Sequence, residues 1–176
     1  VLEKYELGHK LIDGEPTKEL VDGQDPDKLF VERDILYLKD ATDSEEGGRM
    51  VIVLPKQNLS GAQEESVEFR KWLLKKVQIT AIVDLPREAF QPHTGTKTSL
   101  VFLKKVKNIP EDYPIFMAVS EAVGHDRRGN PLYKKDASGM NLLGDDGKEV
   151  IWNDLPEIYA QWNNYVLSGT VKDRTG

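Results

Sequence analysis

Residues 79–105 read ITAIVDLPREAFQPHTGTKTSLVFLKK. Two apolar runs in this stretch, Ile79–Leu85 and Ser99–Leu103, are typical of strands buried in a sheet. The segment between them has no room for a helix, so the second strand is predicted to run antiparallel to the first. That segment is nevertheless long and polar for a strand connection, and it carries a single aromatic residue, Phe90.

The residues before this stretch predict crossover units of an α/β sheet. Asp25-Pro26-Asp27 is typical of a helix start, and the helix that follows is apolar on so many sides that we expect it to be largely buried. The run Arg49–Leu54 predicts a strand covered on both faces, as in a parallel sheet. Ser60 and Gln63 then predict a capping box for a helix to about residue 76. This alternation of helix and strand predicts an α/β fold.

The two ends of the sequence carry weaker signals. Residues 1–25 predict a loop with one helical turn. Beyond residue 107, Pro114–Val119 predicts another short strand, and Gly129-Asn130 predicts a hairpin turn within residues 125–136. Asp154 opens a final predicted helix. The sequence shows no evident internal repeat.

Composition bounds the class of protein. With 176 residues, 39% hydrophobic and 31% charged, the chain is long enough for one folded core. It has no cysteine and no apolar run of membrane-helix length, so we expect a cytoplasmic protein without a membrane partner. The net charge of -6 argues against a dedicated nucleic-acid binder, although charge belongs to an assembled surface and this chain reads as a piece of one.

Catalytic motifs are missing. The sequence contains no G-x-G-x-x-G, no P-loop and no G-x-S-x-G, and its three histidines are far apart, without metal-binding spacing. We therefore expect no catalytic residue, no cofactor-binding residue and no metal site in this chain.

Several short sequence motifs, in this order, resemble motifs of the amino (N6-adenine) DNA methyltransferases, and within them of the modification subunit of type I restriction-modification systems. The motifs lie between residues 26 and 160, and their order and spacing carry the resemblance. They are Phe30-Val31-Glu32-Arg33, Gly47–Pro55, Arg70–Leu74, Asp84–Lys105, Gly124–Tyr133 and Asp154–Glu157.

The resemblance implies which part of the enzyme this chain represents. Two family hallmarks are absent: the glycine-rich loop for S-adenosylmethionine and the Asn/Asp-Pro-Pro-Phe/Tyr loop that grips the adenine amino group. Both precede the helix at residue 26 in the family. Residues 1–107 would thus be the C-terminal half of a methyltransferase-like, Rossmann-like α/β domain with an antiparallel last strand, and residues 108–176 an appended strand, hairpin and terminal helix. The chain alone should be inactive.

The same resemblance implies site residues and partners. The target adenine is flipped out of the duplex and needs a new stacking face. Phe90 would supply that face and Pro55 would line the base pocket; an ordinary core role for Phe90 is the alternative. The implied partners are double-stranded DNA and the specificity and restriction subunits. The residues expected to contact DNA are Lys56, Gln57, Thr94, Thr96, Lys97, Arg127 and Arg128.

A second reading remains open, in which the chain is a non-catalytic α/β protein-interaction module. The acidic net charge favours this reading. Its contact regions would be the 125–136 hairpin and the segment Trp152–Trp162. The same hairpin and the loop at Lys56 could also be simply solvated.

Overall fold

The structure is a computed structural model that describes residues 1–168. The chain divides into two compact units, one made of Val1–Ile82 with Ser99–Ile115 and the other of Val83–Thr98 with Phe116–Gly176. The sequence predicted a different boundary, at residue 107, between part of a methyltransferase-like domain and an appended segment. That boundary stays a prediction. No helix within residues 1–168 is both long and apolar enough to cross a bilayer.

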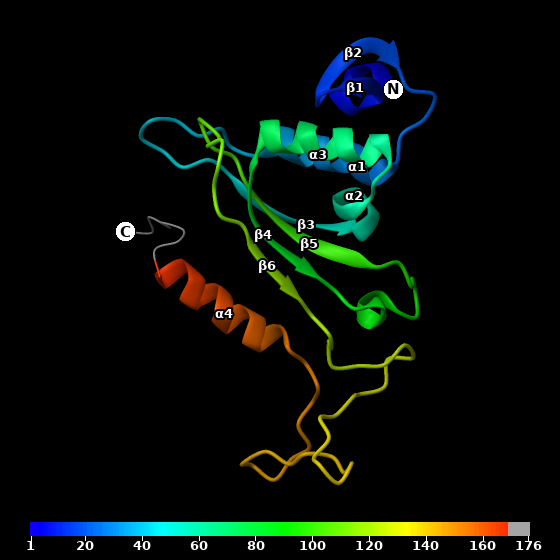
Figure 1. The fold of residues 1–176 in the computed structure, drawn as a ribbon, viewed down its shortest axis with the longest axis vertical. Coiled ribbons are helices and arrows are strands. Elements are labelled where there is room, and N and C mark those ends of the chain that lie inside the picture. The colour runs from blue at the N-terminus through cyan, green and yellow to red at the C-terminus, as the bar shows by residue number, and fades with distance from the viewer. Residues whose placement is uncertain (169–176) are drawn as a thin grey trace. The chain divides into compact units, whose positions relative to one another are not determined.

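The main sheet has four strands in the order β3, β5, β4, β6 (Figure 1). The strands are β3 (Arg49–Pro55), β4 (Gln78–Asp84), β5 (Thr98–Lys104) and β6 (Phe116–Val119). The backbone N–H of Leu85 donates to Thr98 O at 2.9 Å and joins the end of β4 to the start of β5. The N–H of Lys105 donates to Gly48 O at 2.9 Å and joins the end of β5 to the start of β3. β5 is therefore antiparallel to both neighbours, which confirms the direction predicted for the 99–104 strand.

Two helices cover the sheet in the first unit. They are α1 (Pro26–Tyr37) and α3 (Glu64–Lys76), and they lie over the same face of the strands (Figure 1). Val31 from α1 and Phe69 and Trp72 from α3 are fully buried, together with Leu54 of β3 and Val101 of β5. This apolar cluster is the core that holds the strand ends, and the loops after them, in place.

Helix α1 is less buried than its apolar sequence predicts. Phe30 and Leu36 are exposed, whereas Glu32 is buried. The Glu32 carboxylate accepts the backbone N–H groups of Glu6 and Leu7 at 2.7 and 2.8 Å. These two bonds compensate for the removal of the carboxylate from water, so the buried face of α1 can include the polar residue Glu32. The expectation of a largely buried apolar helix is wrong.

Strand β3 is covered on one face. Val51 exposes 52% of its surface and Val53 is also exposed, while Leu54 is fully buried. Among the described strands β3 stands at an edge of the sheet. The prediction of a strand covered on both faces is therefore wrong for this chain. A run of β-branched residues favours a strand, but it does not distinguish an edge from a centre.

The N-terminal segment is a hairpin preceded by two short helical turns. Asp13 and Gly14 form the hairpin turn with φ of 51° and 73°, the pair of positive values that a type I′ turn requires. The loop predicted for residues 1–25 is therefore wrong. The elements are η1 (Leu2–Lys4), η2 (Glu6–Gly8), β1 (His9–Ile12) and β2 (Glu15–Leu20).

A short extra helix, α2 (Lys56–Ser60), separates β3 from α3. Ser60 ends α2, and its hydroxyl donates to Lys56 O at 3.1 Å. Helix α3 begins after Gln63 without a side-chain cap. The predicted helix to residue 76 is present, but the predicted capping box does not form, because Ser60 belongs to the preceding helix.

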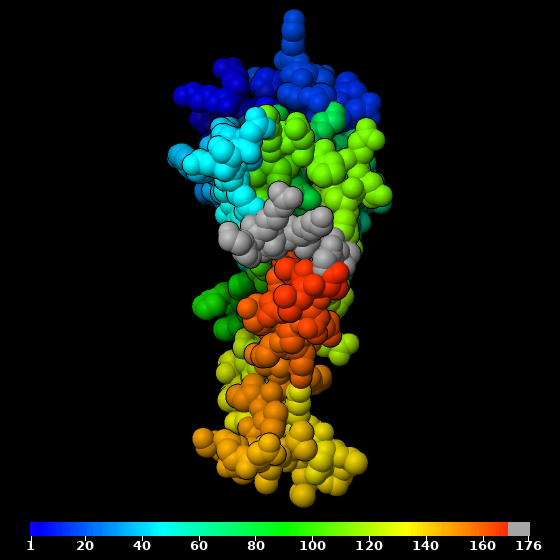
Figure 2. Space-filling view, turned by 90° about the vertical axis from the view of Figure 1, so that its left-hand side faces the viewer, coloured from blue at the N-terminus to red at the C-terminus, as the bar shows by residue number. Residues whose placement is uncertain are grey.

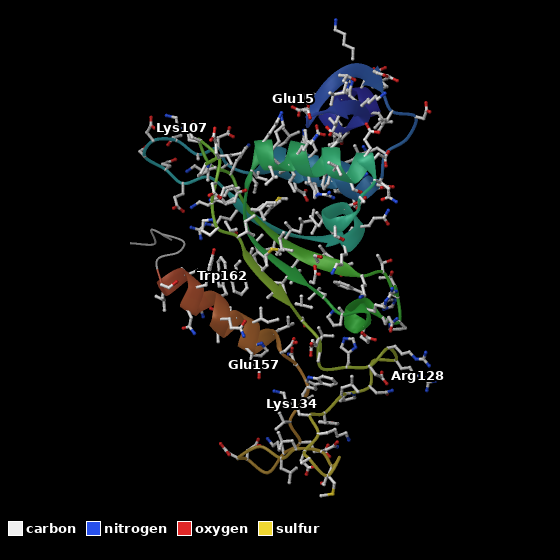
Figure 3. All side chains as sticks on the ribbon, in the orientation of Figure 1. Glu15, Lys107, Arg128, Lys134, Glu157 and Trp162 are labelled. Atoms are coloured by element: carbon white, nitrogen blue, oxygen red, sulfur yellow. The ribbon has the colours of Figure 1, made fainter. Side chains whose placement is uncertain are left out.

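In the second unit, α4 (Leu155–Leu167) packs on β6. The rings of Phe116 and Trp162 meet edge to face, with centroids 5.4 Å apart (Trp162 is labelled in Figure 3). The final helix predicted from Asp154 is therefore confirmed. The Asp154 carboxylate accepts the Ser120 hydroxyl at 2.6 Å instead of capping the helix, so it ties α4 to the end of β6.

Residues 123–153 form three similar turns, which we call the three-turn module. The N–H of each closing glycine donates to a carbonyl three residues earlier, at 2.9 to 3.0 Å, and each glycine has a positive φ. The module spreads sideways at its tip, in yellow and orange (Figure 2). The hairpin turn predicted at Gly129-Asn130 is present, and the backbone turn recurs twice more with different residues at its tip. The turns are Asp126–Gly129, Asp136–Gly139 and Gly144–Gly147.

Candidate nucleic-acid interface

The end of β3 carries three of the residues that the sequence suggested for a base pocket or for DNA. Pro55 is the last residue of the strand, and Lys56 and Gln57 open α2 directly after it. A hollow of about 520 Å³ lies beside them, bounded also by the starts of α1 and α3. We call it the β3-end hollow. Its lining includes Asp27, Pro55, Gln57, Asn58, Gln63 and Ser66.

Hydrogen bonds hold the walls of the β3-end hollow. Asn58 is buried, and its amide nitrogen donates to Asp27 Oδ2 at 2.5 Å. The Arg70 guanidinium donates to Gly61 O at 2.9 Å and fixes the link between α2 and α3. Gly61 has no room for a side chain, since a Cβ there would lie 2.5 Å from Gln57 O. The shape of the hollow is thus set by the protein itself.

Phe90 lies on the second unit, at the end of the short helix η3 (Arg87–Phe90). It exposes 38% of its surface, so it is not one of the buried core residues. The Arg87 guanidinium donates to Gly95 O at 3.1 Å and closes the loop that follows. An aromatic face that is open to solvent can receive a base. The stacking role itself stays a prediction.

The loop after Phe90 carries the predicted phosphate contacts. The Thr94 hydroxyl donates to the Thr96 hydroxyl at 3.1 Å and accepts the Thr96 backbone N–H at 3.2 Å. Lys97 is exposed, and its ammonium has no hydrogen-bond or ion-pair partner within residues 1–168. Both hydroxyls and the free cation are of the kind that bind phosphate oxygens.

The first turn of the three-turn module presents Arg127 and Arg128. The Asp126 carboxylate accepts the backbone N–H groups of Arg128 and Asn130 at 2.7 and 2.9 Å. The hydrogen bond from the Asn130 side chain, followed by the backbone bonds, lowers the pKa of Asp126, so the carboxylate stays ionised. In the described part of the chain neither arginine side chain forms a hydrogen bond or an ion pair, although the charge of Arg128 acts on Asp126, and Arg128 points away from the chain (Figure 3).

A second hollow, of about 430 Å³, lies within the second unit. Pro86 and Glu88 line it from the segment that carries Phe90, and His125, Arg127 and Trp152 line it from the three-turn module. The structure therefore brings two of the predicted DNA-contacting segments together. The third, at the end of β3, belongs to the other unit.

Sequence reasoning missed four polar residues of the β3-end hollow. Asn58 and Asp27 bond across 31 positions, and such pairs leave no local pattern in a sequence. The one available signal was the polar run after a strand end, where α/β folds place their sites. The missed residues are Asp27, Asn58, Gln63 and Ser66.

Among residues 1–168 no three histidine, aspartate or glutamate side chains group as metal ligands would.

Residues 24–145 match the family model of N-6 DNA methylase. The chain belongs to the N-6 DNA methylase family. The matched region of this methylase chain runs from the start of α1 into the three-turn module. It includes every residue that the sequence suggested for the site, from Pro55 to Arg128. A search of the curated proteins found no match.

Solved structures share the fold of this methylase chain. A protein of a type I R-M (restriction-modification) system, from work on complex assembly and conformational transition, matches with a TM-score of 0.50 at 18% identity, over 82% of this chain and 26% of its own. A modification subunit of a type I restriction enzyme from Vibrio vulnificus YJ016 gives 0.42 at 19%, over 72% and 31%. A class I S-adenosylmethionine-dependent methyltransferase from Listeria monocytogenes gives 0.41 at 19%, over 52% and 26%. The chain spans about a quarter to a third of these proteins.

Proposed function

We propose that this chain is the C-terminal part of a DNA adenine-N6 methyltransferase, the modification subunit of a type I restriction-modification system. The observation that supports the proposal most is the family match over residues 24–145. Strand β5 lies between β3 and β4 and runs antiparallel to both, which agrees with the resemblance found in the sequence. In this proposal the whole enzyme methylates a flipped adenine in double-stranded DNA.

Within that enzyme, the second unit would receive DNA. A flipped base loses its neighbours in the stack, and Phe90 offers an exposed ring in their place. Thr94, Thr96 and Lys97 would contact the backbone on one side, and Arg127 and Arg128 on the other. Because phosphate contacts fix the position of a protein on DNA, these residues would orient the duplex for extrusion of the base.

The methyl donor in this proposal is S-adenosylmethionine, which supplies the transferred methyl group when it is bound. The residues of this chain do not fit it. The connections after β3 and β4 contain no glycine-rich loop, since Pro55 leads directly into α2 and Pro86 into η3. We assign no step to the donor here, and we expect the chain alone to transfer no methyl group.

The proposed partners are the specificity and restriction subunits of a type I complex, in the cytoplasm. The structural relative from the type I R-M system was studied for complex assembly. A partner subunit that reads the recognition sequence would also explain why a chain of net charge -6 works on DNA, since the cationic surface need not lie on this chain.

The test uses the intact subunit assembled with its partners. The complex is incubated with DNA and methyl-labelled S-adenosylmethionine, and the DNA is digested to nucleosides. We expect label in N6-methyladenine. Label in cytosine alone, or none with an assembled complex that binds the donor, would overturn the proposal.

A second candidate function is that of a protein-interaction module without catalysis. The exposed apolar side chains Met140, Leu143 and Ile151, gathered in the three-turn module, favour it. Two measurements distinguish the two functions, partner binding by this chain and adenine modification by the intact protein. An interaction module would bind a partner subunit with this chain alone, and the intact protein would leave adenine unmodified.

A further inference from the structure

Two glutamine side chains at the rim of the β3-end hollow are paired. The Gln57 amide nitrogen donates to Gln63 Oε1 at 3.0 Å. Within residues 1–168 no partner is present for the other half of each amide, so the Gln57 carbonyl oxygen is free to accept and the Gln63 NH₂ group is free to donate. The hydrogen-bonded pair therefore offers one free acceptor and one free donor.

That pattern complements an amino-substituted nucleobase. Adenine presents an amino group beside a ring nitrogen that accepts, and glutamine amides read this edge by giving one acceptor and one donor. We propose that Gln57 and Gln63 bind an adenine base of the DNA, with Gln57 Oε1 accepting the amino group and Gln63 Nε2 donating to the ring nitrogen. The inference rests on the proposed function, because it requires DNA as the ligand.

The interior of the hollow also points to a polar ligand. Ser66 exposes only 4% of its surface and lines the hollow, yet its hydroxyl has no hydrogen-bond partner in the part of the chain that the structure describes. The hydroxyl oxygen is not one of the fully buried unbonded atoms of residues 1–168, so it remains accessible for a hydrogen bond. A base in the hollow would supply the missing partner, either a ring nitrogen that accepts or an amino group that donates.

Charge distinguishes a base from a phosphate. The hollow is lined by the carboxylates of Asp25, Asp27 and Glu65 and by one cation, Lys28. Lys28 is 3% exposed and already lies 3.5 Å from Asp25 and 3.8 Å from Glu65. An added phosphate would meet this excess of negative charge, whereas a neutral base would not. The carboxylates suit an amino group, which donates to them.

The backbone between the two exposed glutamines is held by hydrogen bonds. Gly61 sits between the two glutamines in the chain, its N–H donates to Gln57 O at 2.8 Å, and Arg70 fixes its carbonyl. Because the two residues are carried on the ends of packed helices α2 and α3, little backbone freedom is lost when a base binds.

Gln63→Glu in the intact subunit is the sharpest variant. A glutamate keeps the oxygen that accepts from Gln57, removes the free donor and adds one negative charge. The matched control is Gln161→Glu, which adds the same charge on the exposed face of α4. We expect Gln63→Glu to weaken binding of cognate DNA about tenfold relative to the control, as for one lost base contact. Equal binding by the two variants would overturn the inference.

Modified DNA identifies the atom and the base. Adenines of the recognition site are replaced one at a time by 7-deazaadenine or 1-deazaadenine, each lacking one ring acceptor. At one position, one analogue should cost wild type about tenfold in affinity and cost Gln63→Ala nothing further. That position is either the target adenine or a neighbouring one. If the loss of affinity from the analogue and the loss from Gln63→Ala multiply at every position, no adenine ring nitrogen bonds to Gln63.

The outcomes separate the two proposals. A wild-type complex that methylates adenine while Gln63→Glu equals its control removes the glutamine pair and leaves the enzyme function intact. A wild-type complex that neither binds nor methylates adenine-containing DNA removes both.

Discussion

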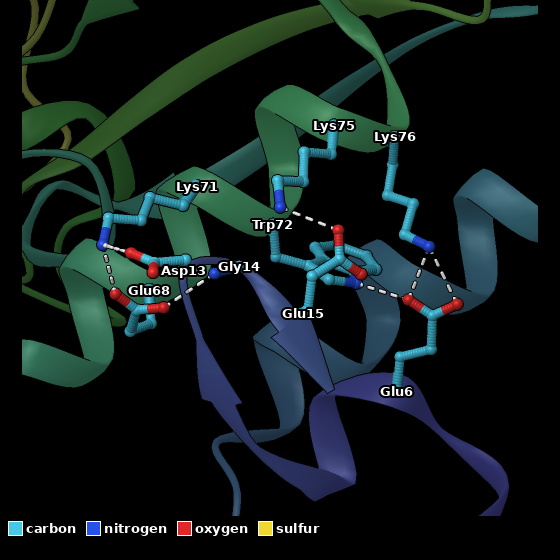
Figure 4. Close-up of polar contacts among 9 residues, drawn as sticks. All are labelled: Glu6, Asp13, Gly14, Glu15, Glu68, Lys71, Trp72, Lys75 and Lys76. Atoms are coloured by element: carbon cyan, nitrogen blue, oxygen red, sulfur yellow. Dashed lines mark hydrogen bonds and ion pairs between the residues drawn. The ribbon is translucent and has the colours of Figure 1, made fainter. Parts of the chain in front are cut away.

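Glu68 Oε2 accepts the backbone N–H of Gly14 at 2.7 Å, across 54 positions of the sequence (Figure 4). Its other oxygen accepts from the Lys71 ammonium at 2.6 Å, and the same ammonium reaches Asp13 at 2.9 Å. The turn of the β1–β2 hairpin is therefore tied to α3 through two carboxylates, Glu68 on the helix and Asp13 on the turn. Further along, Glu6 accepts from the Trp72 indole at 2.7 Å, so the attachment runs along the helix.

This attachment predicts a loss of stability in acid. The hydrogen bonds from Lys71 and then from Gly14 lower the pKa of Glu68 below its ordinary 4.5, and the bond from Lys71 lowers the pKa of Asp13. Burial raises the pKa of Glu6, but the bonds from Lys76 and Trp72 outweigh it and lower the value. A carboxylate with a lowered pKa stabilises the fold above its unfolded pKa, and the contribution is lost as the pH falls through the folded pKa.

The urea midpoint should therefore decrease as the pH falls below about 4.5. Glu68→Gln should lower the midpoint at pH 7 and flatten its dependence on pH, because the titrating group is gone. Glu64→Gln, on the exposed start of the same helix, is the control and should leave both unchanged. An unaltered pH profile in Glu68→Gln would contradict this explanation.

Gly14→Ala should be strongly destabilising. Gly14 has a φ of 73°, and a Cβ there would lie 2.7 Å from the backbone of Lys71 and Trp72. Gly147 is the matched control, since its φ is 74° and a Cβ there would have no neighbouring atom within 4 Å. Gly147→Ala should cost about 1–2 kcal/mol for the left-handed backbone. Gly14→Ala should cost clearly more in a chemical denaturation experiment, and equal costs would mean that the hairpin moves freely away from α3.

Replacement of Arg127 and Arg128 by glutamine should weaken binding of all DNA sequences by the intact complex and reduce its salt dependence. Each lost phosphate contact lowers the slope of log K against log salt by roughly 0.9. Lys148→Gln, on the third turn of the same module, is the control. Filter binding at several salt concentrations gives the slopes. A double variant with the wild-type slope would remove these arginines from the DNA surface.

Phe90→Ala should slow methylation of cognate DNA in the intact enzyme, while affinity for the methyl donor stays normal. Loss of one stacking face costs about 1–3 kcal/mol, which is about 5- to 150-fold in rate. Phe90→Trp should restore activity because it keeps an aromatic face. Phe30→Ala, on the exposed side of α1, serves as the control. Unchanged turnover in Phe90→Ala would end the stacking assignment.

The direction of β5 could be predicted because it depends on chain length alone. The segment between β4 and β5 cannot hold a crossover helix, so the chain must turn back. The β1–β2 hairpin could not be predicted in the same way, although Asp13-Gly14 is a strong turn signal. Its second strand contains Pro16 and charged residues without alternation, and its stability comes from α3, which lies more than 40 positions away.

One residue of the candidate site could be predicted because it is unusual for its position in the sequence. Phe90 stood out as the lone aromatic of a polar loop, and the structure leaves it partly exposed. The β3-end hollow was not predictable, because its polar walls are assembled from three helices. Asn58 reads as a loop residue in the sequence, and only the fold shows that it is buried against Asp27.

The three-turn module separates its scaffold from its tips. Every turn is closed by a backbone bond from a glycine of positive φ. Two tip side chains add bonds of their own, because the Ser138 hydroxyl donates to the Asp136 carboxylate and the Asp146 carboxylate accepts the Lys148 N–H. The tips are basic at Arg127-Arg128, small at Ala137-Ser138 and acidic at Asp145-Asp146. The side chains of Arg127 and Arg128 form no hydrogen bond within their turn, so this tip can be exchanged without rebuilding the backbone, and new contacts can be engineered there, or can evolve, independently of the helices and the sheet.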